Sequence, residues 1–408
     1  MKFIADLHIH SAYSRGCSKQ LTLANIAKWC RYKGINLVST GDFTHPVWLK
    51  SIKQELRPEG NGFYVLKDGT EKTRFVIGSE ISCIYTQGGK CRRVHVCILA
   101  PSIETAERLN QALLKKGCNL KSDGRPIIGL SAKALAQLCW ETDEDFFIFP
   151  AHAWTPWYSI FGSKSGFDTI EECFEELTPK IRAIETGLSS DPAMNHRLSM
   201  LDNIALLSNS DAHSLANIGR EANVFDLSEP DINYSSLIRI IKKNDGKKFI
   251  STIEFFPEEG KYHVDGHAAC NYSCLPQVSA KNNNLCVVCG KPLILGVMNR
   301  ISALADRKRY DENKFRPFIS LIPLQEIIAE AYGVGKNSKR VMTEYLRLVQ
   351  ICPEFTTLME LNRAGLNKIM DATIAESILK VRMKKVHITP GYDGVFGKVK
   401  IKLSLRQE

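Results

Sequence analysis

Residues 3–10, Phe-Ile-Ala-Asp-Leu-His-Ile-His, form a short apolar run that ends in two histidines. Six further apolar runs, most of them with polar ends, follow before residue 255: NLVSTGD (36–42), RFVIGSE (74–80), RVHVCIL (93–99), FFIFPAH (146–152), RAIETG (182–187) and IALLSNSD (204–211). Helical patterns lie between several of them, for example residues 21–34, which stop at Gly34, and residues 168–177. Strands that alternate with helices predict a parallel sheet with crossover helices. About seven such units favour a closed or nearly closed β/α barrel, with an open doubly wound sheet as the alternative.

Ionisable side chains gather at or near the ends of these predicted strands. They are His8, His10, Asp42, Glu80, His95, His152, Asp211 and His213. Because the active site of a β/α barrel lies at the C-terminal ends of its strands, we expect these side chains to converge there. His8 and His10 share one side of an extended segment, since side chains alternate along a strand. A carboxylate such as Glu80 can bridge two metal ions.

Mixed imidazole and carboxylate ligands indicate two or three divalent ions, with Zn²⁺, Mn²⁺ or Fe²⁺ favoured and Mg²⁺ as a further option. Such a cluster is suited to phosphate-ester hydrolysis, because the ions activate water and neutralise charge on phosphate oxygens. Arg220 follows Asp211 closely and is a candidate phosphate contact, although an ordinary surface arginine explains it equally well. Glu185 is a candidate for the lining of the same cleft.

The chain divides into three parts by pattern. Residues 1–254 hold the alternating strands and helices. Residues 255–305 have little periodicity and contain Cys270, Cys274, Cys286 and Cys289. These four cysteines predict a structural Zn²⁺ site, because a closed tetrahedral site leaves no position for chemistry. His267 or His263 is an alternative fourth ligand in place of Cys274, whose spacing from Cys270 is unusual. The other nine cysteines are expected to lie largely in the core.

Residues 306–408 form the third part, with helical patterns followed by a Gly-rich turn and a short basic strand. The whole chain of 408 residues has a formal net charge of +10, and this part alone carries 19 Lys and Arg against 12 Asp and Glu. The excess suits a polyanionic partner, and we expect residues 306–408 to grip nucleic acid, with a solvated helical surface as the alternative.

Other classes of protein fit poorly. A hydrophobic fraction of 44% argues against global disorder. The N-terminal residues lack the apolar run of a secretory signal, and no stretch approaches the roughly 18 apolar residues of a membrane span. Thirteen scattered cysteines do not resemble a disulfide framework. We therefore expect a cytoplasmic, nucleoid-associated protein.

The segments DLHIHS, TGD, GSE, VHV, PAH and SNSDAH, in this order, resemble the PHP (polymerase and histidinol phosphatase) superfamily. The resemblance implies a distorted seven-stranded β/α barrel. It implies one metal held by His8, His10, Glu80 and Asp211, and a second held by Glu80, His95 and His152. Asp42 and His213 would form a third site. That site departs from the family pattern, because the family has a His after Thr-Asp and a further His where this chain has Gly16.

Longer phrases across the whole chain, among them TGDFTHPVWL, FGSKSGFDTIEECF, IETGLSSDP and GVMNRISALADR, resemble the endonuclease Q family. The resemblance implies hydrolysis of DNA on the 5′ side of uracil, hypoxanthine, xanthine or an abasic site, leaving a 3′-hydroxyl and a 5′-phosphate. Asp211, His213, Glu80 and Arg220 would be catalytic. Whether a replication or repair clamp is a partner stays open.

A damaged base must leave the stack before an enzyme inspects it. The segment 161–170 is the predicted lesion pocket, with Phe161 and Phe167 for stacking and Ser163, Lys164 and Gly166 for polar contacts. Trp154 and Trp157 are further aromatic candidates beside His152. A barrel loop with a helix cap at Asp168 is the alternative for this segment.

Two other functions compete. A phosphatase of a small phosphomonoester, such as histidinol phosphate, shares the barrel but has no need for a cysteine module or a basic tail. A zinc-dependent DNA-binding or scaffold protein with a degenerate barrel is the non-enzymatic alternative, and the full ligand set argues against it.

Overall fold

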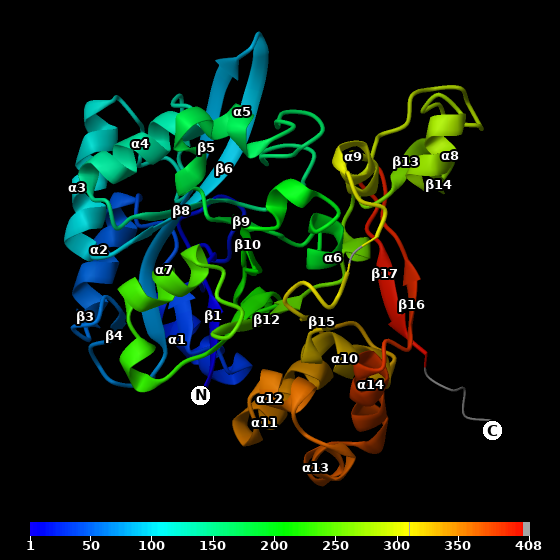
Figure 1. The fold of residues 1–408 in the computed structure, drawn as a ribbon. Helices are drawn as coiled ribbons and strands as arrows, with labels where there is room; N and C mark the ends of the chain where they lie inside the picture. Colours follow the sequence, from blue (N-terminus) through cyan, green and yellow to red (C-terminus); the bar gives the residue numbers. More distant parts are fainter. Residues whose placement is uncertain (310, 403–408) are drawn as a thin grey trace.

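The computed structural model describes residues 1–309 and 311–402, and within them eleven strands form one mixed sheet. Helices cover this sheet, and a separate group of helices follows at the C-terminal end of the chain (Figure 1). The strands are β1 (Lys2–Asp6), β2 (Leu37–Ser39), β3 (Leu56–Pro58), β4 (Tyr64–Leu66), β5 (Arg74–Gln87), β6 (Lys90–Ala100), β7 (Ile127–Ile128), β8 (Phe147–Pro150), β11 (Ala222–Asp226), β12 (Phe249–Glu254) and β15 (Phe318–Ser320). The fold is therefore of the mixed α/β class, as predicted.

The sheet is not the parallel barrel that the alternating pattern predicts. Its order is β15-β12-β11-β1-β2-β5-β4-β3, with β6 paired to β5 and β8, and β7 paired to β5. The pairs β1–β2 and β2–β5 are parallel, but β5–β6, β6–β8, β1–β11 and β11–β12 are antiparallel. Strands β9 (Ala183–Glu185) and β10 (Ala205–Leu207) form a parallel pair of their own. A single closed ladder of seven strands is therefore not confirmed.

All seven predicted strands are nevertheless present, as β1, β2, β5, β6, β8, β9 and β10. Backbone hydrogen bonds just beyond the strand ends join neighbours that the ladders leave apart. The Ala153 amide donates to the Glu185 carbonyl (2.9 Å), which links β8 to β9, and the Asp211 amide donates to the His8 carbonyl (2.9 Å), which links β10 to β1. These bonds bring the C-terminal ends of the strands around one point.

The helices of the first part are α1 (Leu23–Lys33), α2 (Pro46–Glu55), α3 (Ile103–Lys115), α4 (Ala132–Thr142), α5 (Ile170–Phe174), α6 (Pro192–Asn195) and α7 (Tyr234–Lys242). Short 3₁₀ helices are η1 (Glu175–Lys180), η2 (Ser199–Leu201), η3 (Leu215–Asn217), η4 (Glu229–Asp231), η5 (Pro257–Glu259) and η6 (Ala268–Cys270). The predicted helix over residues 21–34 is confirmed as α1. Its first turn is capped by the Thr22 side chain, and it ends at Gly34, whose φ of 86° suits a residue without Cβ.

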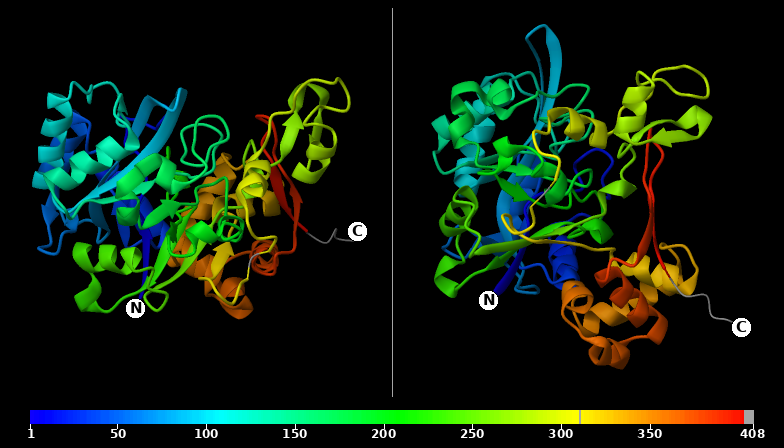
Figure 2. Two further views of the ribbon diagram at one scale, coloured as in Figure 1. Left: turned by 45° about the horizontal axis from the view of Figure 1, so that its top comes forward. Right: turned by 45° about the vertical axis from the view of Figure 1, so that its right-hand side comes forward.

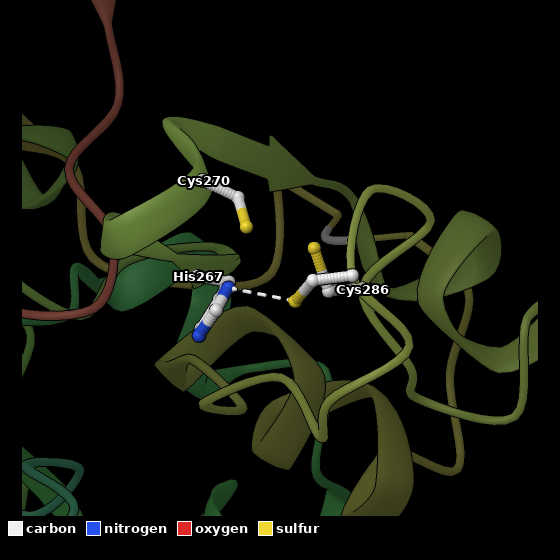
Figure 3. Close-up of side chains that lie close together, drawn as sticks. His267, Cys270 and Cys286 are labelled. Atoms are coloured by element: carbon white, nitrogen blue, oxygen red, sulfur yellow. Dashed lines mark hydrogen bonds between the residues drawn. The ribbon is translucent and has the colours of Figure 1, made fainter.

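The cysteine-rich part forms a small projection with β13 (Asp265–His267), β14 (Tyr272–Cys274), α8 (Pro276–Lys281) and α9 (Val297–Leu304). Strands β13 and β14 are antiparallel, and the side chains of His267, Cys270 and Cys286 lie close together beside them (Figure 3). We call residues 255–305 the Cys module.

The C-terminal part contains α10 (Leu324–Tyr332), α11 (Lys339–Ile351), α12 (Glu354–Met359), α13 (Arg363–Ile369), α14 (Ala372–Arg382), β16 (Val386–Thr389) and β17 (Lys398–Ile401). The predicted helical region and the final basic strand are confirmed. Strands β16 and β17 form an antiparallel hairpin that runs from the helices to the Cys module (Figure 2). At its tip the Asp393 carboxylate accepts a hydrogen bond from the Ala268 amide (2.6 Å), so the hairpin fastens the module to the helices.

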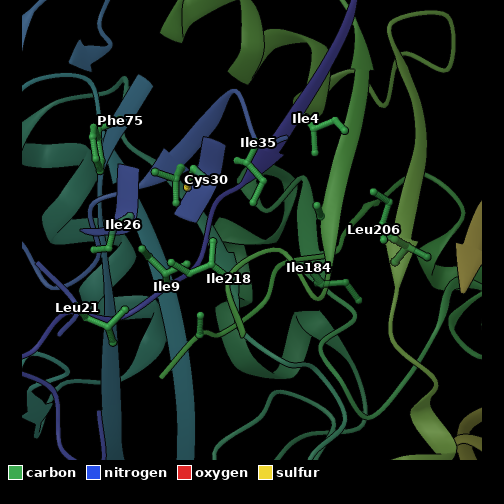
Figure 4. Packing of buried hydrophobic residues seen from close by; sticks show 14 of the residues in the cluster. Ile4, Ile9, Leu21, Ile26, Cys30, Ile35, Phe75, Ile184, Leu206 and Ile218 are labelled. Carbon is green, nitrogen blue, oxygen red and sulfur yellow. The ribbon is translucent and has the colours of Figure 1, made fainter. Parts of the chain in front are cut away.

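The main core lies between the helices and the sheet. Ile4, Ile26, Cys30 and Phe75 pack there with other apolar side chains, all of them buried (Figure 4). Within the described residues, no helix is long and apolar enough to cross a membrane.

Candidate metal centre

Two groups of potential metal ligands meet at the carboxylate of Glu80, which is fully buried in the middle of β5. The first group is His8, His10, Glu80 and Asp211, and the second is Glu80, His95 and His152. Within each group the ligand atoms lie within 4.8 Å of one another. The convergence of these six side chains was predicted from the strand ends, and the structure brings all six together.

The two oxygens of Glu80 face different groups. Oε2 lies 3.2 Å from His10 Nε2 and 3.5 Å from His8 Nε2. Oε1 lies 2.7 Å from His95 Nδ1 and 3.0 Å from His152 Nε2. Glu80 therefore has the geometry of a carboxylate that bridges two ions.

The donor atoms are those that a divalent ion needs. His8 Nε2, His10 Nε2 and Asp211 Oδ1 are buried, and within the described residues none has a hydrogen-bond partner of good geometry. They converge nevertheless, with His10 Nε2 lying 3.1 Å and His8 Nε2 lying 3.7 Å from Asp211 Oδ1. Buried polar atoms without partners are costly, and a shared cation removes that cost. Burial lowers the pKa of His95 to about 4, which keeps its imidazole in the neutral form that coordinates metals.

Carboxylates behind the ligands orient the imidazoles. His8 Nδ1 lies 3.0 Å from an oxygen of Glu185, which also accepts hydrogen bonds from the His152 amide (2.7 Å) and from Asn209 (2.9 Å). Carboxylates in this position fix the tautomer of a ligating histidine. Glu185 is fully buried, so it supports the ligands instead of lining an open cleft. Cys97, predicted as a core residue, lies in the same buried group as His8 and Glu185.

The predicted third metal site is not assembled. Asp42 Oδ1 lies 3.0 Å from His10 Nδ1, and its Oδ2 accepts hydrogen bonds from the Ser11 amide, the Ser11 hydroxyl and the Ser14 hydroxyl. Its acceptor positions are thus occupied, and Asp42 orients His10 as Glu185 orients His8. His213 lies at the exposed edge of the metal centre, where about one-third of its side chain is exposed. Its Nδ1 lies 2.8 Å from the Asp211 carbonyl oxygen. Among the described residues, the candidate ligand groups include neither Asp42 nor His213.

The backbone at the centre adopts rare conformations. Asp42, His152 and Asp211 have φ angles of 50°, 28° and 46°. Such positive values are unfavourable for residues with a side chain and concentrate at functional sites. Gly187 approaches His152 so closely that a Cβ on Gly187 would lie 2.6 Å from the Cβ of His152, so this position requires glycine.

Two arginines lie beside the ligands. Arg125, whose Nη1 lies 3.2 Å from Glu80 Oε2, was not predicted from the sequence, because the loop 118–126 carries no motif. Arg220 was predicted to contact phosphate, but its Nε donates to the Ser210 carbonyl (2.9 Å) and its Nη2 lies 3.4 Å from the Asp211 carbonyl. Arg220 therefore holds the loop that presents Asp211.

In the predicted lesion pocket over residues 161–170, the aromatic side chains are buried. Phe161, Phe167 and Trp154 are at most 2% exposed, so none of them can stack on a base. Phe161 packs on Trp154, and the Arg92 guanidinium lies over Phe167. Arg300 of α9 holds this segment by donating to the carbonyls of Phe161 and Phe167, each at 2.9 Å. Ser163 and Lys164 are exposed, whereas Gly166 is buried against Gly162 and Ile160. The segment nevertheless lines a cavity of about 560 Å³ together with Arg92 and Arg300. Thr169, not Asp168, caps α5.

In the Cys module, four side chains lie close enough to hold one ion: His267, Cys270, Cys286 and Cys289. They come from the end of β13, from η6 and from the loop after α8, and Figure 3 shows His267, Cys270 and Cys286 pointing toward one another. Cys274, the predicted fourth ligand, is not in the group, and the alternative ligand His267 takes its place. Cys274 is in β14, opposite Asp265 in the hairpin, and the Cys270–Cys274 spacing carries it away from the cluster.

A buried cluster of imidazoles and carboxylates around one shared carboxylate has the ligand chemistry of a hydrolase that uses divalent ions. The solved structure of the lesion-specific endonuclease PfuEndoQ from Pyrococcus furiosus is 30% identical to this chain, with a TM-score of 0.86 over 99% of this chain and 98% of that one. A structure of endonuclease Q with a 27-mer duplex substrate that has an abasic lesion at the active site is also 30% identical, with a TM-score of 0.85 over 100% and 99%. The chain therefore belongs to the endonuclease Q family, and it is an endonuclease, a hydrolase of phosphodiesters.

Two further similarities cover different lengths of the chain. The uncharacterized protein YqxK of Bacillus subtilis is 29% identical over 98% of this chain and 99% of its own length. The family described as the MJ0043 C-terminal domain matches residues 323–385, which are the helices α10 to α14.

Proposed function

We propose that this protein is a metal-dependent DNA repair endonuclease. Its reaction would be hydrolysis of the phosphodiester on the 5′ side of a deaminated base (uracil, hypoxanthine or xanthine) or an abasic site. The observation that carries the proposal is the bridging geometry of Glu80 between two ligand groups. The related endonuclease Q complex, with an abasic lesion of a DNA duplex at its active site, supports the substrate.

The residues of each group are proposed to hold one divalent ion, with His8, His10, Glu80 and Asp211 around the first and Glu80, His95 and His152 around the second. Zn²⁺ or Mn²⁺ suits this mixture of ligands, and Mg²⁺ is a further option for the test. Such ions, when bound, make water nucleophilic near neutral pH and neutralise charge on phosphate oxygens. Attack of water on phosphorus breaks the bond to the 3′-oxygen, so the products are a 3′-hydroxyl and a 5′-phosphate.

The chain's own residues would position the phosphate and move protons. Arg125 is partly exposed at the mouth beside Glu80, where its guanidinium can pair with a non-bridging phosphate oxygen. His213, beside Asp211, would have its Nδ1–H held by the Asp211 carbonyl, which leaves Nε2 to accept a proton from the attacking water. Arg220 supports Asp211 from behind. Asp42 would orient the imidazole of His10.

We propose a division of labour among the three parts of the chain. Residues 1–254 would carry the chemistry. The Cys module, residues 255–305, would hold one structural Zn²⁺, because three thiols and one imidazole suit that ion and leave no open position. Residues 306–408 would grip DNA. Arg382 of this last part would not bind DNA, because its guanidinium donates hydrogen bonds to the carbonyls of Leu358, Leu361 and Thr357.

The test is a nicking assay with metal-stripped protein to which Mn²⁺, Zn²⁺ or Mg²⁺ is returned. Labelled duplexes differ at one position only, which holds uracil, hypoxanthine, an abasic site or an undamaged base, and a phosphomonoester is assayed in parallel. We expect a single nick 5′ to each lesion and none in the undamaged duplex. Turnover of the phosphomonoester without nicking would instead assign the protein to the small-molecule phosphatases.

A further inference from the structure

A cavity of about 480 Å³ lies on the outside of the first part of the chain, between helices α2 and α3 and the loop that precedes β7. Its volume is within the roughly 300–1,000 Å³ of ordinary binding pockets. The lining residues of each helix recur at spacings of three and four, so each helix contributes one face. Among them are Pro46, Leu49 and Lys53 of α2, and Glu107, Asn110 and Leu114 of α3. We call this cavity the α2–α3 groove.

Much of the wall of the groove is apolar. Leu49 and Leu120 line it as buried side chains, whereas Leu114 is 53% exposed. Burial of apolar surface is the main favourable contribution to most protein association. A molecule that fills the groove and covers Leu114 therefore gains binding free energy from the hydrophobic effect.

The groove also contains a buried polar atom without a partner. Asn110 is 8% exposed, and its Nδ2 donates a hydrogen bond to the Phe43 carbonyl (3.0 Å). Its Oδ1 is buried and accepts no hydrogen bond from any described residue. Buried acceptors are almost always paired, because an unpaired one costs free energy. An N–H or O–H group on a molecule in the groove would supply the missing donor.

The rim of the groove is positively charged. Lys50, Lys53 and Lys121 line it, and all three are exposed. The acidic residue that lines the groove, Glu107, already forms an ion pair with Lys53. Lys50 and Lys121 form no ion pair with a described residue. The groove is therefore complementary in charge to a molecule that carries carboxylates beside its apolar part.

These features together favour a protein segment over DNA as the occupant. A phosphodiester has no hydrogen to donate to Asn110 Oδ1, and the bases of a duplex are stacked inside it. Helices α2 and α3 also lie on the side of the molecule away from the Cys module and the β16–β17 hairpin (Figures 1 and 2). Grooves between helices and other elements commonly bind one amphipathic segment of a partner protein.

We propose that the α2–α3 groove is a docking site for an acidic segment of a partner protein that inserts an apolar anchor. The anchor would be a side chain such as tryptophan, whose ring covers Leu114 and whose N–H donates to Asn110 Oδ1. Carboxylates beside the anchor would pair with Lys50 and Lys121. None of the described candidate metal ligands lines the groove, so the partner would tether the protein and leave the metal centre open. This inference does not depend on the reaction proposed above.

The experiment measures binding of fluorescein-labelled peptides to the whole protein by fluorescence anisotropy. The test peptide is a run of aspartates followed by leucine and tryptophan. In three related peptides, phenylalanine replaces the tryptophan, serine replaces both apolar residues, or lysine replaces the aspartates. The groove variants are Leu114→Asp and the pair Lys50→Glu with Lys121→Glu. All three positions are exposed, and melting temperatures check that each variant is folded.

Two control variants make the same changes elsewhere. Ile351→Asp alters an apolar residue of α11 that is 54% exposed, and Lys72→Glu with Lys247→Glu alters two other exposed lysines. We expect the wild type to bind the serine and lysine peptides at least about tenfold more weakly than the test peptide, and the phenylalanine peptide more weakly as well. Each groove variant should weaken binding of the test peptide at least about tenfold, and each control less than about twofold.

Three results would overturn the assignment. In the first, the peptides bind equally or the groove variants behave like their controls. In the second, duplex DNA displaces the test peptide, and Lys50→Glu with Lys121→Glu weakens DNA binding by the same factor, which makes the groove part of the DNA path. In the third, analytical ultracentrifugation shows a wild-type dimer that Leu114→Asp converts to a monomer, which makes a second copy of this chain the occupant. Failure to nick any lesion would contradict the proposed function and not this site.

Discussion

At the scale of single residues, Asp211 is the ligand whose loss separates catalysis from binding. Its Oδ1 lies 3.1 Å from His10 Nε2, within the first ligand group. Changes behind a metal ligand cost about 10–100-fold, so Asp211→Asn, which alters a ligand itself, should lower the nicking rate about a thousandfold or more. DNA affinity should change less than about threefold, because phosphate contacts dominate it. Nicking rate and affinity on one uracil duplex decide this, and a parallel loss of both would contradict it.

Whether the role of a site residue could be predicted depends on whether a short sequence motif identifies it. His8, His10, Glu80, His152 and Asp211 lie at or just after the ends of predicted strands and His95 lies within one, and a short motif is enough to place them. Asp42 also ends a strand, but its role depends on Ser11 and Ser14, which saturate its carboxylate, and no spacing shows this. Arg125 lies in a loop whose position is set by tertiary contacts alone. Phe161 and Phe167 looked available for stacking because sequence does not reveal that Trp154 and Arg92 cover them.

The buried acids Glu254 and Glu221 give a pH dependence of stability. Burial and the neighbouring acids raise the pKa of both carboxyls, with Asp191 acting on Glu254 and Glu254 itself on Glu221. The folded protein keeps a proton that the unfolded chain releases above about pH 4.5, so stability falls as pH rises from there toward the raised pKa of the folded state.

Glu254→Gln should therefore stabilise the protein by an amount that grows with pH. The gain in unfolding free energy should be about 1 kcal/mol or more larger at pH 9 than at pH 5, since one pKa unit corresponds to about 1.4 kcal/mol. Denaturant titrations at both pH values measure it. The exposed Glu229→Gln is the control and should show no such trend, and a pH-independent effect of Glu254→Gln would refute the explanation.

At the scale of elements, periodicity predicted α1, α10, α11 and α14 well, because each has a buried stripe and a clear start or stop. It missed the hairpin β3–β4 and the strand β11, which come from short runs that resemble loops. The helical patterns predicted in residues 306–408 include two short helices, α12 and α13, and the Asn362 side chain caps α13. The antiparallel direction of β6 was not visible, since alternation gives the faces of a strand and not its direction.

The ion site of the Cys module is an element whose folding should depend on metal. Cys286→Ser combined with Cys289→Ser should lower zinc content by about one ion per chain and speed amide exchange in residues 263–294, because structural Zn²⁺ supplies folding free energy to such small units. His267→Ala should also lower the zinc content and speed amide exchange in these residues. Cys274→Ser is the matched control, since Cys274 lies outside the cluster, and it should keep the full zinc content. Zinc loss in Cys274→Ser with none in His267→Ala, measured by elemental analysis, would make Cys274 the fourth ligand in place of His267.

At the scale of the whole molecule, the three parts are fastened to one another. Lys33 of α1 forms a buried ion pair with Glu354 of α12 (2.8 Å), and Tyr345 of α11 donates to the same carboxylate (2.8 Å). The β16–β17 hairpin joins the helices to the Cys module. Each of these interactions joins residues far apart in the sequence, so a sequence pattern confined to one part did not reveal them.

The last prediction concerns how the C-terminal part binds DNA. In β17 the side chains of Val399 and Ile401 face inward, so Lys398, Lys400 and Lys402 share the exposed side by the period-two alternation of a strand. Interactions with phosphates set affinity and salt dependence, whereas interactions with an extruded base set specificity. Changing the three lysines to alanine should weaken binding to damaged and undamaged duplexes by similar factors.

The slope of log affinity against log salt should fall by roughly 0.9 for each phosphate that the variant no longer neutralises, up to about three phosphates. A matched triple change of Lys115, Lys116 and Lys247 removes the same charge from exposed positions near α3 and α7, on the side away from β17 in Figure 1, and should leave the slope nearly unchanged. Binding is measured over a salt series on both duplexes. If the preference for damaged DNA is lost while the slope is constant, the hairpin recognises the lesion and does not bind phosphate. If neither the affinity nor the slope changes, other cationic side chains of the protein bind the phosphates, and the assignment of β17 to phosphate binding is wrong.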